Sequence, residues 1–310
     1  MRGRPPGAAA RPLLLVAAVL VLAGCTSPGA PAASSPPSTA AAPPASSAPI
    51  DVSAELAALE SEFDARIGVS AVDTASDRLV SHRQDERFGY ASSIKVLAAA
   101  QFLRAVPAAE RDEIVTWTAA DVEAAGYSPV TSESIGEGLP LSELAEAAVR
   151  RSDNTALNLV LARLGGPSAL DRGLEDLGDT TTEVVDDEPA LNTIEPGSTA
   201  NTTTPAAFTA ALRAVTLGTA LPGEDRALLL DWMSGNATGD ALVRAGAPSG
   251  WVVADKSGGA GGIRNDVAVV TPPGRDPIVL SILTARNDPD AAYDDALVAR
   301  SAAVVLGALD

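Results

Sequence analysis

Hydrophobic residues divide the chain beyond residue 50 into helical and extended segments. Apolar positions spaced three and four residues apart predict helices at about 52–63, from 92 onward, at 141–150 and at 156–164. Shorter apolar runs predict strands at 66–72, 251–254, 266–271 and 278–284. A last helix is predicted at about 290–306. Strands are therefore expected near both ends of this region, with helices between them.

The order of these segments predicts the architecture. It favours an α/β lobe whose sheet is completed by both ends of the region, with an all-helical lobe inserted between them. Turn signals agree with this arrangement. Gly165-Gly166 would end one helix, and Thr204-Pro205 would begin another with a capping hydroxyl and a proline in the first turn.

The N-terminal residues are typical of an export signal. Three arginines precede an apolar run at 13–24, which is shorter than the roughly 20 residues of a membrane-spanning helix. The run ends in LAGC, which resembles the bacterial lipobox, whose cysteine is lipidated and becomes the mature N-terminus. We therefore expect residues 1–24 to be a lipoprotein signal peptide and Cys25 to be lipidated. The alternative is a secreted protein in which Cys25 is incidental.

Residues 26–49 are mainly proline, serine and alanine and carry no charge. Such a segment has too few large apolar side chains to fold. We expect residues 25–49 to be a linker that holds the domain 50–310 off the outer face of the cytoplasmic membrane, with part of the protein released. The length of that domain suits one domain or two closely joined lobes.

Composition excludes several classes of function. The formal charge is -18, and loss of the signal peptide would remove three arginines and no acids, giving -21. Such a chain does not attract nucleic acid or anionic lipid through its surface charge. With one cysteine and one histidine, we expect no internal disulfide, metal site or cofactor. His82 would have to serve any Ser-His-Asp triad, and we expect it to be a surface residue instead.

The chain contains only two lysines, Lys95 in YASSIKVL and Lys256 in VVADKSGG. Lys95 follows Ser92 by three residues, on the same face of the predicted helix. A serine hydroxyl is a poor nucleophile near neutral pH unless a base takes its proton, and a partly desolvated lysine can be that base because burial lowers its pKa. In a motif this short, a capping serine beside a surface lysine is the alternative.

Two further polar motifs accompany the lysines. Ser152-Asp153-Asn154 lies in the turn between two predicted helices, where helix capping by the aspartate is the alternative explanation. Lys256-Ser257-Gly258 lies at the end of a predicted strand, and the glycines that follow let a ligand or another backbone come close. A nucleotide-binding loop is not favoured, because no helix follows to receive a phosphate.

In this order and at these separations, the three motifs resemble those of the serine β-lactamases and penicillin-binding proteins. The resemblance covers essentially the whole folded part. It implies the fold of that superfamily, an antiparallel sheet flanked by helices with an inserted helical lobe. It also explains the two lysines, because arginine does not titrate and could not act as a base in their place.

A fourth segment distinguishes the branches of that superfamily. Residues 188–192, EPALN, resemble the omega-loop motif of class A β-lactamases, in which a glutamate and an asparagine hold the hydrolytic water. Penicillin-binding transpeptidases lack this motif, so their acyl-enzymes persist. Tyr127 in YSPVT resembles the tyrosine at the rim of the family's pocket. The alternative for DDEPALN is an acidic surface loop.

The resemblance implies that a serine is acylated and then freed. Ser92 would attack the β-lactam carbonyl while Lys95, or Glu188 through a water, accepts its proton. The backbone amides of Ser92 and Gly259 would hold the oxyanion. Ser152 would pass a proton to the leaving nitrogen.

Deacylation and substrate binding involve further residues by the same resemblance. Glu188 and Asn192 would activate water on the acyl ester. Arg264 takes the place of a guanidinium that binds the substrate carboxylate, although a surface strand residue is the alternative. The residues expected to bind substrate are Tyr127, Asn154, Lys256, Ser257, Gly258 and Arg264.

The sequence departs from the family at the ends of the omega loop. Relatives often close this loop with an arginine and an aspartate, and the matching residues here are Asp186 and Asn201. At most a hydrogen bond can replace that ion pair, so we expect a somewhat more mobile loop that admits bulky cephalosporins. Ala91 precedes the nucleophile where a cysteine would be needed for a disulfide.

We expect a lipid-anchored, monomeric class A β-lactamase that acts on small-molecule β-lactams. Two alternatives remain. One is a penicillin-binding enzyme that acts on D-Ala-D-Ala peptides, and the other is a catalytically silent lipoprotein that binds cell-wall fragments. Glu188 and Asn192 discriminate against the first, and the intact motifs discriminate against the second.

Overall fold

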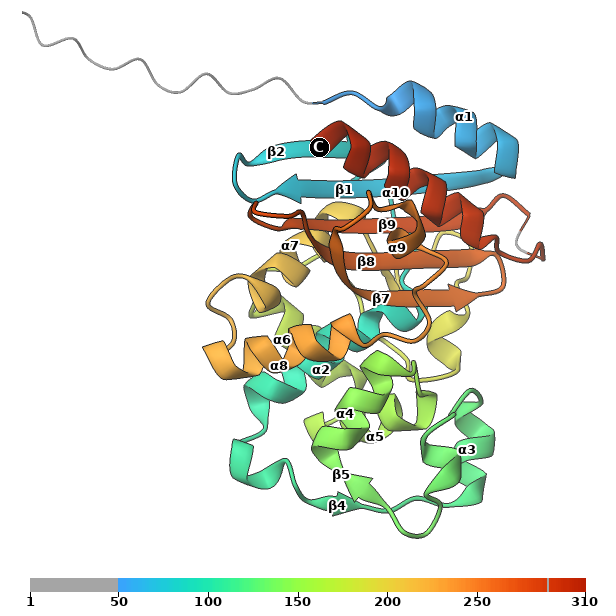
Figure 1. The fold of residues 1–310 in the computed structure, drawn as a ribbon. Helices are drawn as coiled ribbons and strands as arrows, with labels where there is room; N and C mark the ends of the chain where they lie inside the picture. Colours follow the sequence, from blue (N-terminus) through green and yellow to red (C-terminus); the bar gives the residue numbers. More distant parts are fainter. Residues whose placement is uncertain (1–49, 289) are drawn as a thin grey trace, which may run out of the picture. The chain divides into compact units, whose positions relative to one another are not determined.

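The structure, a computed structural model, describes residues 50–288 and 290–310. One lobe is built on an antiparallel five-stranded sheet with the strand order β2-β1-β9-β8-β7 (Figure 1). The strands of this sheet are β1 (Ala65–Asp73), β2 (Arg78–His82), β7 (Val252–Ala260), β8 (Ile263–Thr271) and β9 (Ile278–Arg286). Segments from both ends of the described chain therefore share one sheet, as predicted.

Strand register brings distant residues together. β1 pairs with β9 in an unbroken register that begins with Ala65 opposite Arg286. The hairpin of β7 and β8 places Gly259 opposite Arg264. The glycine expected in the oxyanion hole and the arginine expected to bind the substrate carboxylate are therefore neighbours in the sheet.

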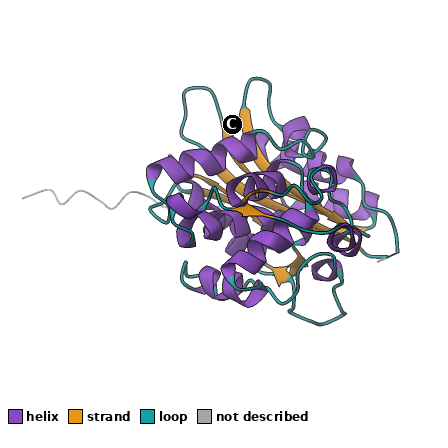
Figure 2. Ribbon diagram, turned by 90° about the horizontal axis from the view of Figure 1, so that it is seen from below, coloured by secondary structure: helices purple, strands orange, loops and turns teal. Residues whose placement is uncertain are grey.

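Helices cover both faces of the sheet (Figure 2). Residues of β8 alternate between two apolar cores, with Ala268 and Val270 in one and Val267 and Val269 in the other. Burial on both faces explains why these strands have nearly continuous apolar sequences. The helices against the first face are α1 (Ser53–Phe63), α9 (Val243–Gly246) and α10 (Asp295–Leu309).

The second lobe is helical and surrounds α2 (Lys95–Ala105). Almost every residue of α2 from Lys95 to Leu103 is buried, which is typical of a helix at the centre of a lobe. The surrounding helices are α3 (Ala119–Ala125), α4 (Leu141–Arg150), α5 (Asn154–Leu164), α6 (Pro167–Glu175), α7 (Pro205–Thr216) and α8 (Gly223–Ser234). The predicted fold class, a sheet lobe with an inserted helical lobe, is confirmed.

Several short elements connect the lobes. β3 (Phe88–Gly89) pairs with β6 (Thr202–Thr203), so the chain just before the Ser92 motif is tied to the end of the omega loop. β4 (Ile114–Val115) pairs with β5 (Leu139–Pro140) at the far end of the helical lobe. Short 3-10 turns lie at Ala91–Ile94, Ala108–Glu110, Thr131–Glu133 and Ala190–Asn192.

Some predicted boundaries were wrong. The helix expected from residue 92 opens with a 3-10 turn, and α2 begins at Lys95. The strand expected at 251–254 continues to Ala260, so Lys256 lies within the strand, because pairing with β8 holds its glycines extended. The last helix begins at Asp295, where the Asp294 side chain caps it. The edge strand β2 was not predicted.

Nowhere in residues 50–288 and 290–310 is there a helix that combines the length and apolar character needed to cross a membrane. The expected signal peptide, Cys25 and the expected linker lie outside the described residues.

Candidate active site

Ser92 lies in a tight turn that the sheet holds in place. Ala91, just before it, has a φ of 45°, a left-handed conformation that is uncommon for a residue with a side chain. The backbone amide and hydroxyl of Ser93 donate to the Tyr90 carbonyl at 3.2 and 2.5 Å. Asn265 of β8 donates to the same carbonyl at 3.1 Å. These contacts fix the turn so that Ser92 faces a cavity.

Lys95 is fully buried, and its ammonium group joins three parts of the chain. Nζ donates to the carbonyl of Ser152 at 2.8 Å and to Oδ1 of Asn154 at 2.6 Å, and it lies 3.0 Å from Oε1 of Glu188. These three acceptors match the three donors of an ammonium group. Burial lowers the pKa of Lys95, and the carboxylate of Glu188 opposes that shift.

The carboxylate of Glu188 is buried and aimed at Ser92. Its Oε1 accepts from Oγ of Ser92 at 3.2 Å, and its Oε2 accepts from Nδ2 of Asn192 at 2.6 Å. Asn158 of α5 holds the backbone of the same residue. Its Nδ2 donates to the Glu188 carbonyl at 2.8 Å, and its Oδ1 accepts from the Glu188 amide at 2.9 Å. Contacts to both backbone and side chain therefore orient this carboxylate.

Ser92 and Glu188 face a cavity of about 380 Å³, a size that suits a small molecule. Of the predicted catalytic and substrate-binding residues, all but Lys95 and Lys256 line it. Those two lysines donate hydrogen bonds to residues that do line it, Asn154 and Ser152. The structure therefore brings together the whole predicted constellation.

Ser152 and Lys256 form a second pair of a hydroxyl and an amine. Ser152 has a φ of 55°, and its Oγ accepts from Nζ of Lys256 at 3.1 Å. Lys256 also donates to the Ser257 carbonyl at 2.7 Å. Burial lowers the pKa of Lys256 to about 7, with the nearby charge of Lys95 as the next cause. Lys256 can therefore change its protonation near neutral pH.

Gly258 allows β7 to lie directly against the nucleophile turn. A Cβ at this position would be 2.9 Å from both the Tyr90 carbonyl oxygen and the Ser93 amide nitrogen. Contacts this short do not occur for real side chains, so a residue larger than glycine would push the strand away from the turn. The close approach brings Gly259 to the cavity beside Ser92, where the two amides of an oxyanion hole are expected.

Arg264 lies at the cationic end of the cavity. Its Nε donates to Oδ1 of Asp295 at 2.6 Å, and its guanidinium carbon lies 4.7 Å from the centre of the Tyr293 ring. Next to it, the hydroxyls of Ser257 and Thr238 are hydrogen-bonded at 2.6 Å. An ion pair and an aromatic ring therefore hold Arg264 at the cavity.

Tyr127 and Asn154 also line the cavity. The side chain of Tyr127 is largely exposed, and its carbonyl accepts from the Asn154 amide at 2.8 Å. Nδ2 of Asn154 donates to the Ala125 carbonyl at 2.8 Å, while Oδ1 accepts from Lys95. Asn154 therefore holds the buried lysine, a contact that the sequence motif did not predict.

Residues 51–308 match the beta-lactamase enzyme family. The chain belongs to this family. It is 47% identical to beta-lactamase 3 of Bacillus cereus over 254 residues, which make up 82% of this chain and 80% of that relative. It is 49% identical to a beta-lactamase of Bacillus amyloliquefaciens over 249 residues, 80% of this chain and 81% of the relative.

Solved structures of the same family are similar to this chain in fold and sequence. A class A beta-lactamase from Clostridium kluyveri DSM 555 has a TM-score of 0.80 at 39% identity, covering 83% of this chain and 97% of that one. A beta-lactamase from Streptomyces albus G also has a TM-score of 0.80, at 42% identity, covering 82% of this chain and 97% of that one. The chain is a class A serine β-lactamase, as its motifs predicted.

The omega loop of this β-lactamase is closed by hydrogen bonds around Asn201. Nδ2 of Asn201 donates to Oδ2 of Asp186 at 2.8 Å, which confirms the predicted bond. Oδ1 of Asn201 accepts from the Tyr90 hydroxyl at 3.1 Å and from the amides of Val185 and Asp186 at 3.2 and 3.1 Å. No charged pair joins residues 186 and 201, and the expected mobility of the loop stays a prediction.

His82 lies on β2, outside the catalytic cavity. Its side chain is only 12% exposed and its Nε2 lies 3.4 Å from Oε1 of Glu60, so the expectation of a surface histidine was wrong. The edge strand that carries it lies against β1 and α10, and Glu60 of α1 reaches the imidazole, an arrangement that was not predicted. In the part of the β-lactamase that the structure describes, no three histidine, cysteine, aspartate or glutamate side chains are grouped as metal ligands would be.

Two functional positions were missed in the sequence. Asn158 follows Asn154 by four residues, so both amides lie on one face of α5, and that spacing could have indicated it. Thr238 and its partner Asn236 lie in a loop without any periodic signal. Nδ2 of Asn236 donates at 2.5 Å to Oδ2 of Asp255, which precedes Lys256 on β7.

Proposed function

We propose that this chain hydrolyses β-lactam antibiotics through an acyl-enzyme on Ser92 and so confers resistance to them. The observation that carries the proposal is the buried carboxylate of Glu188, which lies 3.2 Å from the Ser92 hydroxyl and is bonded to Asn192. A carboxylate in this position can take the proton of a serine and later direct water at its ester. The relatives named beta-lactamases support the same substrate class.

Acylation begins at the Ser92 hydroxyl. Its Oγ attacks the lactam carbonyl carbon while its proton passes to Glu188, and the 3.2 Å contact supports this route. The ammonium of Lys95, 3.0 Å from the same carboxylate oxygen, orients the carboxylate. The oxyanion is held by the backbone amides of Ser92 and Gly259, a contribution of about 3 to 4 kcal/mol per donor.

Collapse of the tetrahedral intermediate breaks the bond from carbon to nitrogen. The leaving nitrogen takes a proton from Ser152, and Lys256, 3.1 Å away with a pKa of about 7, replaces it. The substrate carboxylate lies against Lys256, Ser257 and Arg264, which supply the cationic end of the cavity.

The other end of the substrate meets Tyr127 and Asn154. An amide nitrogen carries two hydrogens, and only one hydrogen of Asn154 is used, in the bond to Ala125. The second can hold the carbonyl of a substrate side-chain amide.

Deacylation requires a water near Glu188 and Asn192. Within the described residues, Oδ1 of Asn192 is a buried acceptor without a hydrogen-bond partner, which suits a bound water. Before this step the proton that Glu188 took from Ser92 returns to Lys256, which restores the carboxylate. Glu188 then takes a proton from this water, the resulting hydroxide attacks the ester carbon, and the bond from that carbon to Oγ of Ser92 breaks as Oγ takes the proton back from Glu188. The product then leaves.

Intact mass spectrometry of the full chain with benzylpenicillin tests this proposal. The adduct should be transient in the unchanged chain, absent in Ser92→Ala, and slow to form but persistent in Glu188→Ala. Glu195→Ala, which changes an exposed glutamate of the same loop, is the matched control and should behave like the unchanged chain. A stable adduct on the unchanged chain would instead favour the penicillin-binding alternative, and turnover by Ser92→Ala would refute the mechanism.

We also propose that residues 1–24 direct export, that Cys25 carries a lipid, and that residues 25–49 link it to a monomeric catalytic domain, 50–310. The support is the LAGC sequence after a short apolar run and the uncharged proline-rich segment that follows. Cys25→Ser should move the activity from the membrane fraction to the medium. An unchanged distribution would contradict lipid anchoring, and light scattering tests the monomer.

A further inference from the structure

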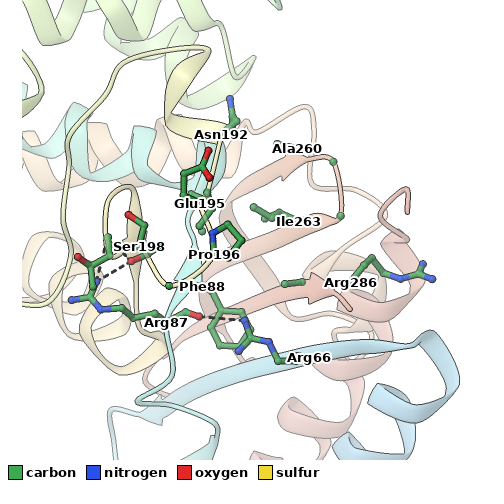
Figure 3. Close-up of a pocket in the computed structure, with 18 residues that line it drawn as sticks. Arg66, Arg87, Phe88, Asn192, Glu195, Pro196, Ser198, Ala260, Ile263 and Arg286 are labelled. Carbon is green, nitrogen blue, oxygen red and sulfur yellow. Dashed lines mark hydrogen bonds between the residues drawn. The ribbon is translucent and has the colours of Figure 1, made fainter. Parts of the chain in front are cut away.

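A second cavity, of about 530 Å³, lies beside the catalytic one (Figure 3). Its walls are the segment 194–199 of the omega loop, the turn between β7 and β8 at 260–263, and β3. Asn192 lines both cavities. No step of the proposed reaction uses this space, although it is larger than the catalytic cavity.

The interior of the second cavity is mainly apolar. Phe88 contributes a buried ring, and Ile194, Pro196, Ile263 and Ala285 contribute aliphatic surface. Figure 3 shows Pro196 and Ile263 facing each other across it, above Phe88. Water gains few hydrogen bonds in such a space, so an apolar body of similar size would displace it favourably.

The lining is cationic although the chain as a whole has a charge of -18. It includes three arginines and a single acid, Glu195. Arg66 lies over the Phe88 ring, 4.5 Å from its centre. Of its five donors, one bonds to Glu86 at 2.9 Å and another reaches the Arg87 carbonyl at 3.5 Å. Arg66 therefore retains donors for an anion held above Phe88.

The other two arginines differ in their partners. Arg87 bonds to Thr202 at 2.9 Å and lies 3.6 Å from Glu183, which ties β3 to the end of the omega loop. Arg286 donates to the Ala292 carbonyl at 3.2 Å, and no carboxylate of the described residues lies within ion-pair distance of it. Its guanidinium points away from the apolar walls, at the edge of the cavity (Figure 3).

We propose that this cavity is a regulatory site for a small amphipathic anion, with an apolar body between Phe88 and Ile263 and a carboxylate on Arg66. Two walls of the cavity adjoin catalytic residues. The segment 194–199 follows Asn192, whose Nδ2 holds Oε2 of Glu188 at 2.6 Å, and Ala260 follows Gly259. An occupant that moves the first wall displaces Asn192 and slows deacylation.

The kinetic consequence is specific. Slower deacylation lowers kcat and KM together and leaves kcat/KM unchanged, because acylation is not affected. The expected effect on kcat and KM rests on the proposed function, whereas binding of the anion in the second cavity does not.

Calorimetry of the full chain with phenylbutyrate tests the binding. We expect a Kd on the order of 1 mM for so small a ligand, and a much weaker Kd for the uncharged phenylbutanol. Ala285→Trp fills the cavity and should abolish binding, and Arg66→Gln should weaken it about tenfold. The control variants are Ala210→Trp and Arg213→Gln, which change residues of a different groove, lined by α7. They should bind phenylbutyrate like the unchanged chain.

Steady-state hydrolysis of benzylpenicillin with phenylbutyrate tests the regulation. In the unchanged chain we expect phenylbutyrate to lower kcat and KM by the same factor. In Ala285→Trp we expect no further fall on addition of phenylbutyrate, because the indole already occupies the cavity. Circular dichroism checks that each variant is folded. If Ala285→Trp does not fold, Arg66→Gln takes its place as the variant with weakened binding.

A rise in KM at constant kcat would place the anion in the catalytic cavity and overturn the proposal. Absence of binding at about 10 mM, or full binding by both variants, would also overturn it. Binding as expected without any hydrolysis would refute the proposed function and leave the site intact.

Discussion

The side-chain amide of Asn158 holds both backbone groups of Glu188. Its Nδ2 donates to the carbonyl at 2.8 Å and its Oδ1 accepts from the amide at 2.9 Å. Asn154, one turn earlier on α5, accepts from Lys95 at 2.6 Å. One helix therefore sets the position of the buried carboxylate and of the buried amine that faces it.

Replacement of Asn158 tests this relationship. In Asn158→Ala both hydrogen bonds are lost and buried backbone groups of Glu188 are left unpaired, which costs about 1 to 3 kcal/mol of unfolding free energy. We also expect slower deacylation, because the carboxylate is no longer held in place. Urea unfolding and acyl-enzyme lifetime measure the two effects. Asn287→Ala, at an exposed asparagine, is the control and should change neither; equal behaviour of the two variants would contradict the role of Asn158.

Replacement of Gly258 should impair acylation more than stability. In Gly258→Ala the new methyl group meets the Tyr90 carbonyl and the Ser93 amide, so β7 must move away from Ser92. A displacement of this kind can lower kcat/KM about a hundredfold. The control is Gly307→Ala in α10, where a new Cβ meets nothing within 4 Å. This replacement should stabilise the helix by about 0.5 to 1 kcal/mol and leave kcat/KM unchanged. Normal kcat/KM in Gly258→Ala would show that the close approach is dispensable.

The pKa of Lys256 predicts how activity depends on pH. Because burial lowers this pKa to about 7, the amine of the free enzyme loses its charge as the pH rises through that value. Its attraction for the substrate carboxylate then weakens, so kcat/KM should fall above about pH 7. Lys256→Arg keeps the charge, so this decline should vanish even if overall activity is lower. The same decline in that variant would assign it to another group.

The same shift predicts how stability depends on pH. In the unfolded chain the lysine titrates near 10.5, so between about pH 7 and 10.5 the unfolded state binds the extra proton. The contribution of Lys256 to stability therefore rises with pH across that window, and Lys95, whose pKa is also lowered, acts in the same direction. Urea unfolding at several pH values should show that the free energy of unfolding rises less with pH in Lys256→Met than in the unchanged chain. A rise as steep as in the unchanged chain would contradict the lowered pKa.

Asn201 determines how firmly the omega loop is closed. Asn201→Ala removes the bonds to Tyr90, Val185 and Asp186, so the amides of residues 183–201 should exchange hydrogen faster. Asn201→Gly loses the same bonds but suits the φ of 56° better, which separates the side-chain effect from backbone strain. In the unchanged chain we expect this loop to exchange faster than β9. Protection equal to that of β9 would contradict the expected mobility.

Short motifs revealed most of the candidate site because each catalytic group lies within a few residues of another along the chain. Ser92 and Lys95 share one turn, and Ser152 and Asn154 share another. Asn158 and Thr238 escaped notice because their partners, Glu188 and Ser257, are distant in the sequence. Lys256 was expected after a strand, but pairing with β8 carried the strand through it.

The sequence by itself determined the order of helices and strands, the family and the identity of the reactive groups, since periodicity and motifs are local properties of a chain. The tertiary structure alone decided the protonation and aim of those groups. Burial lowers the pKa of Lys256, and Asn158 turns Glu188 toward Ser92 across 30 residues of chain. Desolvation and hydrogen-bond geometry depend on which surfaces meet when the chain folds, and this is why only the structure could reveal them.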